Sequence, residues 1–71
     1  MIHLEMGDKV VYCDMFNRYE GTVTGFLKGD RVALRDTADK EMIFIESVDY
    51  VLEHAHIERN GELLQRDSVE R

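Results

Sequence analysis

The stretch Gly21-Thr-Val-Thr-Gly-Phe-Leu-Lys-Gly-Asp-Arg-Val-Ala-Leu-Arg35 decides the expected fold. Its two β-rich runs, residues 21–27 and 31–35, flank the three-residue connection Lys28-Gly29-Asp30. A glycine in so short a connection supplies the positive φ that a hairpin turn requires. In the second run apolar and polar residues alternate, which is the period of a half-buried strand. The stretch therefore predicts a β-hairpin around which the remaining strands are arranged.

Other short β-rich runs surround this hairpin. We expect, in chain order, an extended lead-in or short strand at 1–6, a strand at Lys9–Cys13, a loop at Asp14–Glu20, a strand at Glu41–Glu46, one helical turn at Ser47–Val51 and a closing strand at 52–57. Ser47 is a residue type that caps helices. Asn60-Gly61 is a type I′ turn dipeptide, which favours a final hairpin between residues 52–58 and 62–65. Several short strands at this spacing predict an all-β domain.

Two positions within these runs carry further expectations. Gly25 interrupts the first strand of the hairpin, which is typical of a bulge or a sharp bend. The four apolar residues Met42-Ile-Phe-Ile45 have no polar alternation. We expect this strand either to be buried on both sides or to have one face packed and the other paired with a partner.

Length and composition limit the architecture. The chain has 71 residues, which we interpret as one domain over residues 1–66 and a frayed tail over 67–71. Its single cysteine, Cys13, excludes an internal disulfide, and a cysteine at a strand end is usually a small core residue. No run approaches the ~18 apolar residues of a membrane span, so we expect a cytoplasmic, soluble protein. A domain this small depends for its stability on a well-packed core or on self-association.

The net charge of −6 is concentrated in one segment. Residues 1–35 carry five acidic and five basic residues, and residues 59–71 carry three of each. Residues 36–58 carry seven acidic residues against Lys40 alone, which accounts for the whole net charge. We call this segment the acidic segment. A surface of this charge repels nucleic acid and attracts basic surfaces.

Four runs of the chain resemble an SH3-like barrel: Gly7–Tyr12, Glu20–Gly25, Arg31–Leu34 and Met42–Ile45. They are similar to KOW-type modules of ribosomal and transcription proteins, in which a Gly-Asp-x-Val strand leads into a Gly-x-Val hairpin. The likeness covers residues 6–52. It implies a small five-stranded, partly open barrel, with a C-terminal hairpin or a short helix beyond it. KOW-type modules usually present basic surfaces to RNA or to RNA-bound proteins, and the acidic segment departs from that pattern.

No motif indicates catalysis or a bound cofactor. His54-x-His56, with Glu53 and Glu58 nearby, has the spacing of two metal ligands on one strand face, but a closed zinc site needs four ligands. We therefore expect solvent-facing histidines on an edge strand, no metal and no cofactor. Cys13 has no neighbouring base that would make it a nucleophile, so we do not expect an enzyme.

Charge suggests a function instead. Acidic residues two apart on a strand are separated by about 6.6 Å, comparable to successive phosphates of nucleic acid. By size and charge the chain is similar to phage-encoded acidic DNA-mimic proteins. We expect a non-catalytic inhibitor or regulator that occupies the basic, DNA-binding surface of a partner protein. The expected partner-binding residues are Asp36, Asp39, Glu41, Glu46, Asp49, Glu53 and Glu58.

Alternatives remain open. The acidic segment could serve only as a solubilising face. A KOW-like module could instead bind RNA or a transcription or ribosomal assembly through aromatic residues Phe16 and Tyr19 and basic residues Lys28, Arg31 and Arg35. The competing interpretation of these arginines is pairing with acids such as Asp36 or Glu41. Under any of these functions, exposed strand edges favour a homodimer.

Overall fold

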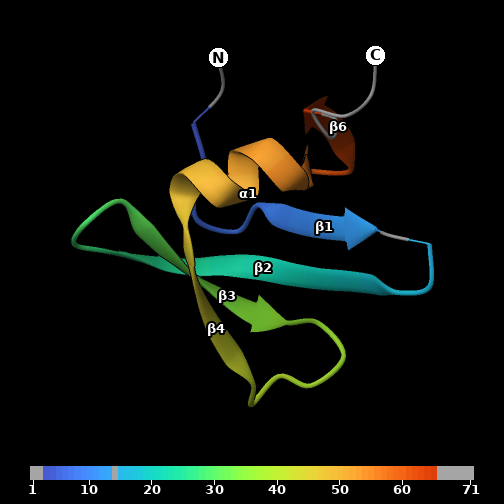
Figure 1. Ribbon diagram of the computed structural model, residues 1–71, viewed down its shortest axis with the longest axis horizontal. Helices are drawn as coiled ribbons and strands as arrows, with labels where there is room; N and C mark the ends of the chain where they lie inside the picture. The colour runs from blue at the N-terminus through green and yellow to red at the C-terminus, as the bar shows by residue number, and fades with distance from the viewer. Residues whose placement is uncertain (1–2, 14, 66–71) are drawn as a thin grey trace.

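Six strands and one short helix make up the computed structural model, which describes residues 3–13 and 15–65. All six strands belong to one antiparallel, open sheet in the order β4-β3-β2-β1-β5-β6 (Figure 1). The expected β-rich class is confirmed, and the six strands form an open sheet that does not close into a barrel. The elements are β1 (Lys9–Cys13), β2 (Arg18–Leu27), β3 (Arg31–Asp36), β4 (Ile43–Ser47), α1 (Val48–His54), β5 (His56–Arg59) and β6 (Glu62–Gln65).

The predicted central hairpin is confirmed as β2 and β3. Its turn has φ +79° at Gly29 and +55° at Asp30, the left-handed backbone that the sequence indicated. β2 begins earlier than expected, because Arg18, Tyr19 and Glu20 pair with the end of β1. The expected loop at Asp14–Glu20 was therefore wrong in its second half: pairing with a neighbouring strand fixes these residues although their own pattern has no β period.

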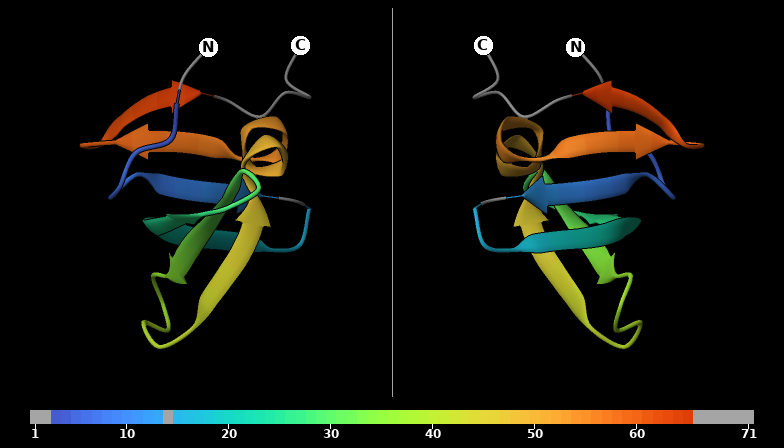
Figure 2. Two further views of the ribbon diagram at one scale, coloured as in Figure 1. Left: turned by 90° about the vertical axis from the view of Figure 1, so that its left-hand side faces the viewer. Right: turned by 90° about the vertical axis from the view of Figure 1, so that its right-hand side faces the viewer.

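A bulge in β2 divides the sheet. The register with β3 shifts between Val23 and Gly25, which confirms the predicted irregularity, and the Thr24 hydroxyl donates to the carbonyl of Ala33 at 3.3 Å. A bulge increases the local twist of a strand pair. Figure 2 shows the result, since β3 and β4 cross the direction of β1 and β5 steeply. The strongly twisted sheet thus bends over its own apolar face.

The core lies under this bend. It combines side chains from four strands, the lead-in and the helix, and α1 lies across the open end of the sheet (Figures 1 and 2). β3 contributes alternate residues to the core, since Val32 and Leu34 are buried and their neighbours are not. The core cluster is Leu4, Val10, Val23, Val32, Leu34, Val51, Ala55 and Ile57. This is a small core, as the chain length requires.

The helix follows β4 directly. Ser47 caps it as predicted, with its hydroxyl oxygen accepting from the Tyr50 amide at 3.2 Å. The helix continues to His54, so the expected closing strand at 52–57 was wrong at its start, and β5 begins only at His56. Burial of Val51 against the sheet extends the single turn that the capping residue alone indicated. None of the described residues forms a helix that is long and apolar enough to cross a membrane.

The predicted final hairpin is confirmed. Asn60 and Gly61 have φ +54° and +81° and join β5 to β6. The lead-in at residues 3–5 is extended but unpaired, and it ends in a turn where the Gly7 amide donates to the Val23 carbonyl. Residues 1–2 of the lead-in, the end of the expected domain at residue 66 and the expected tail 67–71 lie outside the described residues.

The structure excludes one of the two alternatives for residues 42–45 and contradicts the expectation for Cys13. Met42, Ile43, Phe44 and Ile45 are 40–46% exposed, so this run is not buried on both sides. The reason is topological: β4 is the outermost strand and no element covers its free edge. Cys13 is also exposed at the end of β1 and is not a core residue, because it projects from the opposite face of the strand to the core residue Val10.

Candidate functional site

Five rings form a continuous row across four elements of the fold. In order they are Phe44 on β4, Tyr19 on β2, Tyr12 on β1, and Tyr50 and His54 on α1. Successive ring centroids are 5.5, 5.9, 5.9 and 4.4 Å apart, and Phe44 meets Tyr19 edge-on. We call these five residues the aromatic row. Such offset and edge-on contacts stabilise ring pairs beyond their buried area.

Strand register builds the row. Tyr12 and Tyr19 are direct partners across β1 and β2, so both rings project from the same face of the sheet. Phe44 projects from that face too, because its partner on β3 is the core residue Leu34. Gly21 makes room for the row: a Cβ there would lie 2.7 Å from the hydroxyl oxygen of Tyr19. Gly21 therefore lets a tyrosine ring lie directly over the strand.

Acidic residues lie beside the row. Burial raises the pKa of Tyr12 and of Tyr19, and the negative charge of Glu46 raises both further. Asp36 adds to the effect at Tyr19. Both phenols therefore remain neutral at physiological pH. Asp36 pairs with Gly21 and Glu46 pairs with the core residue Val32, so both carboxylates project from the same face of the sheet as the rings.

The structure divides the seven predicted acidic residues into three groups. Asp36, Asp39 and Glu41 belong to the connection between β3 and β4; Glu46, Asp49 and Glu53 surround the start and exposed side of α1; Glu58 is on β5. Since β5 is separated from β3 by β1 and β2 in the sheet, Glu58 is apart from the other six. The acidic residues therefore do not form a single track along one strand.

Several of these carboxylates also have local roles. Asp36 accepts a hydrogen bond from the Ala38 amide, and Asp39 accepts one from the Glu41 amide, which shapes the connection. Asp49 lies in the first turn of α1, where negative charge stabilises a helix. These roles orient the acidic residues without burying them, since Asp39, Glu41, Asp49 and Glu53 remain exposed.

The residues of the RNA-binding interpretation are not brought together in this way. Phe16 is 86% exposed in the loop after β1, whereas Tyr19 is turned into the aromatic row. Arg31 donates to the Lys28 carbonyl at 2.9 Å, and Arg35 donates to the Lys40 carbonyl. Among the described contacts, these arginines have carbonyl partners rather than the carboxylates of Asp36 or Glu41.

The two histidines do not form the expected pair on an edge strand. His54 ends the helix and packs on Tyr50, while His56 opens β5, which has a neighbour on each side. The change from helix to strand at Ala55 separates the directions of the two imidazoles. Among residues 3–13 and 15–65, no group of three or more His, Cys, Asp and Glu side chains has the arrangement of a metal site.

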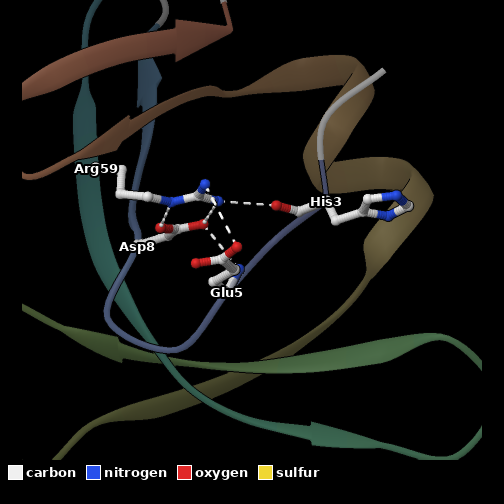
Figure 3. Close-up of polar contacts among 4 residues, drawn as sticks. All are labelled: His3, Glu5, Asp8 and Arg59. Carbon is white, nitrogen blue, oxygen red and sulfur yellow. Dashed lines mark hydrogen bonds and ion pairs between the residues drawn. The ribbon is translucent and has the colours of Figure 1, made fainter.

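The main polar feature that sequence reasoning missed is a buried ion pair (Figure 3). Asp8 is 1% exposed, and its two carboxylate oxygens accept from Nε and a terminal nitrogen of Arg59 at 2.7 and 2.8 Å. The Glu5 amide also donates to Asp8 at 2.8 Å, and Arg59 donates to the His3 carbonyl at 2.9 Å. We call the four residues His3, Glu5, Asp8 and Arg59 the N-terminal clamp.

The N-terminal clamp is a structural device. The hydrogen bonds from the Arg59 guanidinium hold the pKa of Asp8 below its ordinary value of 3.8, although burial opposes them. Asp8 thus remains a carboxylate, and the pair fastens the lead-in to β5 across 51 positions of sequence. The sequence gives no sign that Asp8 and Arg59 pair, since Gly7-Asp8 has the pattern of an ordinary turn and Arg59 is one of several basic residues.

Comparison with family models, with curated proteins and with solved structures found no match to this chain.

Proposed function

We propose that this chain is a small, non-catalytic interaction protein whose acidic and aromatic face binds the basic, nucleic-acid-binding surface of a partner protein and blocks or regulates it. The observation that carries the proposal is that Asp36 and Glu46 project from the same face of the sheet as the aromatic row. The exposed acids of the β3–β4 connection and of α1 extend this face at both ends of β4.

The chemistry of this face fits arginine and lysine side chains. Ring faces attract cations through their quadrupole, and carboxylates pair with guanidinium groups. Phe44 and Tyr50 each retain 40% or more of their exposure, so these members of the row are accessible. Proteins that bind nucleic acid display arginine and lysine side chains at the spacing of phosphates. A face with both carboxylates and rings offers such side chains two kinds of contact.

At the level of the fold, the proposal includes an SH3-like arrangement. The strand order β4-β3-β2-β1-β5, with the helical element between β4 and β5, supports it. The bulge at Thr24, which bends β3 and β4 over the core, supports it as well. In this arrangement β6 is an addition to the edge strand β5.

The test is capture from a cell lysate on immobilised chain, with elution by a salt gradient and, separately, by short duplex DNA. We expect retained proteins to leave the column at high salt, because exposed charge pairs are screened. We also expect duplex DNA to displace them, since DNA competes for the same basic surface. The variant Glu46→Gln/Asp49→Asn/Glu53→Gln should lose most of this retention.

A matched control removes the same number of charges elsewhere. The variant Glu5→Gln/Asp30→Asn/Glu62→Gln lowers the net charge from −6 to −3, as the first variant does, and leaves the proposed face intact. Asparagine tolerates the positive φ of Asp30. Equal loss of retention in both variants would show that only net charge matters and would contradict the proposed face. A gel shift of mixed RNA by the wild-type chain would favour the RNA-binding alternative.

A further inference from the structure

β4 presents an apolar strand edge that nothing in the described chain covers. It is the outermost strand of the sheet and pairs with β3 alone (Figures 1 and 2). Its residues Ile43 and Ile45 are each 46% exposed. Both project from the face opposite the core, because their partners on β3 are the outward residues Arg35 and Ala33.

The backbone of this edge is free to pair. The Met42 carbonyl accepts from the Asp36 amide and the Val48 amide donates to the Asp30 carbonyl, so the even-numbered positions direct their backbone groups to β3. In an antiparallel ladder, successive residues direct these groups to opposite sides. Ile43 and Ile45 therefore direct their N–H and C=O groups away from the sheet, toward the free edge.

The two edges of the sheet differ in protection. β6 has four residues and a register shift in its pairing with β5, both of which discourage a further strand. β4 pairs with β3 over five consecutive positions without a shift and has neither proline nor lysine. A regular, largely apolar edge without these protections is one to which a further strand can pair.

We propose that a second copy of this chain covers β4, so that two β4 strands pair antiparallel about a two-fold axis at Phe44. In this register Ile43 of each copy lies opposite Ile45 of the other, and the free backbone groups of these residues form the ladder. Phe44 lies opposite Phe44 of the second copy on the inner face. Pairing of this kind is isologous, since one surface serves both copies.

Charge disfavours the two registers shifted toward Glu46. Centring the axis on Ile45 would place Glu46 against Phe44 of the second copy, and shifting it further to Glu46 would oppose two carboxylates. With the axis at Phe44, Glu46 faces Met42 of the second copy. The sequence of β4 is thus self-complementary in this antiparallel register.

The small core adds an independent argument for a second copy. Eight residues make up the core cluster, and the chain cannot form an internal disulfide. A domain of this size gains stability from oligomerisation. Burying Ile43 and Ile45 of both copies would add the apolar area that one copy leaves exposed.

The experiment is sedimentation velocity of the full chain over a range of protein concentrations. We expect the wild-type chain to form a dimer, and added salt to strengthen it because the two copies carry like net charge. Ile45→Lys should weaken dimerisation by about tenfold or more, since it places two charges in the ladder. The matched control is Leu63→Lys, on the other edge, where the side chain is also 46% exposed, and it should leave the dimer unchanged. Binding of a basic partner should instead weaken as salt is added. The dimer and the proposed function can therefore be contradicted independently of each other.

A cross-link tests the register. In a non-hydrogen-bonded antiparallel pair the Cα atoms lie about 4.5 Å apart, a separation that a disulfide spans. With Cys13 replaced by serine, Phe44→Cys should therefore give a cross-linked dimer on oxidation, whereas Ile45→Cys should not. A chain that is monomeric at all concentrations, or a dimer that survives Ile45→Lys, would overturn the proposal. Equal weakening by Ile45→Lys and Leu63→Lys would also overturn it.

Discussion

The N-terminal clamp and the β4 edge reverse the usual relation between polarity and burial. Asp8 is charged and 1% exposed, whereas Ile45 is apolar and 46% exposed. Asp8 can be buried because a guanidinium and a backbone amide satisfy its oxygens. Ile45 is exposed because β4 is the last strand of the sheet. Position in the sheet and available partners therefore decide burial at these sites, and hydropathy does not.

The largest expected effect comes from disrupting the buried ion pair of the N-terminal clamp. Asp8→Ala removes three hydrogen bonds to a buried carboxylate, two of them from the Arg59 guanidinium, and should destabilise the fold by about 3–5 kcal/mol. Since proteins have total stabilities of about 5–15 kcal/mol, this loss is a large part of the free energy of unfolding. Urea unfolding followed by circular dichroism measures the loss. Glu5→Gln, which removes only the exposed partner of Arg59, should cost less than about 1 kcal/mol.

A second prediction sets a core residue against an edge residue. Leu34→Ala removes a fully buried side chain and should cost about 2–5 kcal/mol. Ile45→Ala, measured at protein concentrations low enough to keep the chain monomeric, should cost less than about 1 kcal/mol. Equal losses in urea unfolding would mean that β4 is buried in the monomer, contrary to the structure.

A third prediction concerns pH. Because the pKa of Asp8 is held below 3.8 by hydrogen bonds from Arg59, its contribution to stability is complete above the pKa of the unfolded chain, near pH 4. The contribution should decrease as the pH falls below about 4 and disappear below the folded-state pKa. Unfolding midpoints measured from pH 7 to pH 2 give this dependence. In Asp8→Asn the part due to Asp8 should be absent, and an unchanged acid profile would contradict the assignment.

A smaller effect is expected at the junction between β4 and α1. Ser47→Ala removes the oxygen that accepts from the Tyr50 amide and should cost about 1 kcal/mol. Ser47→Asp, which keeps a capping oxygen, should restore most of the loss. Thermal unfolding of the three proteins tests this order, and a neutral Ser47→Ala would show that burial of Val51 alone determines where the helix begins.

The smallest effect is expected inside the aromatic row. The hydroxyl groups of Tyr12 and Tyr19 are buried, and no hydrogen-bond partner for them is present among the described residues. Tyr12→Phe and Tyr19→Phe should therefore be neutral or slightly stabilising, because each removes a polar group that burial penalises. Urea unfolding provides the measurement. A loss above about 1 kcal/mol would indicate that these hydroxyls do have partners.

Local signals predicted much of the fold. The turn residues Gly29 and Gly61, the capping residue Ser47 and the bulge near Gly25 all act within a few positions of sequence, and the structure confirms each of them. The errors arise where distant segments meet. Residues 18–20 form a strand because they pair with β1. The helix continues to His54 because Val51 is buried in the core.

The candidate site was less accessible to sequence reasoning. The seven acidic residues could be listed, but their division into three groups follows from the order of strands. The aromatic row unites residues 12, 19, 44, 50 and 54, whose spacing in sequence has no period. No sequence signal joined Tyr12 to Tyr19, because residues 14–20 were expected to form a loop and their pairing with β1 is visible only in the structure.

The sequence by itself determined the β-rich class, the turns, the helix cap and the concentration of charge in residues 36–58, because each depends on residue type and near neighbours. Only the tertiary structure decided that Asp8 meets Arg59, that five rings align and that β4 is left at the edge. The physical reason is that strand pairing and ion pairing join residues far apart in the chain. Which of them meet depends on the order and twist of the whole sheet, and no local pattern specifies that order.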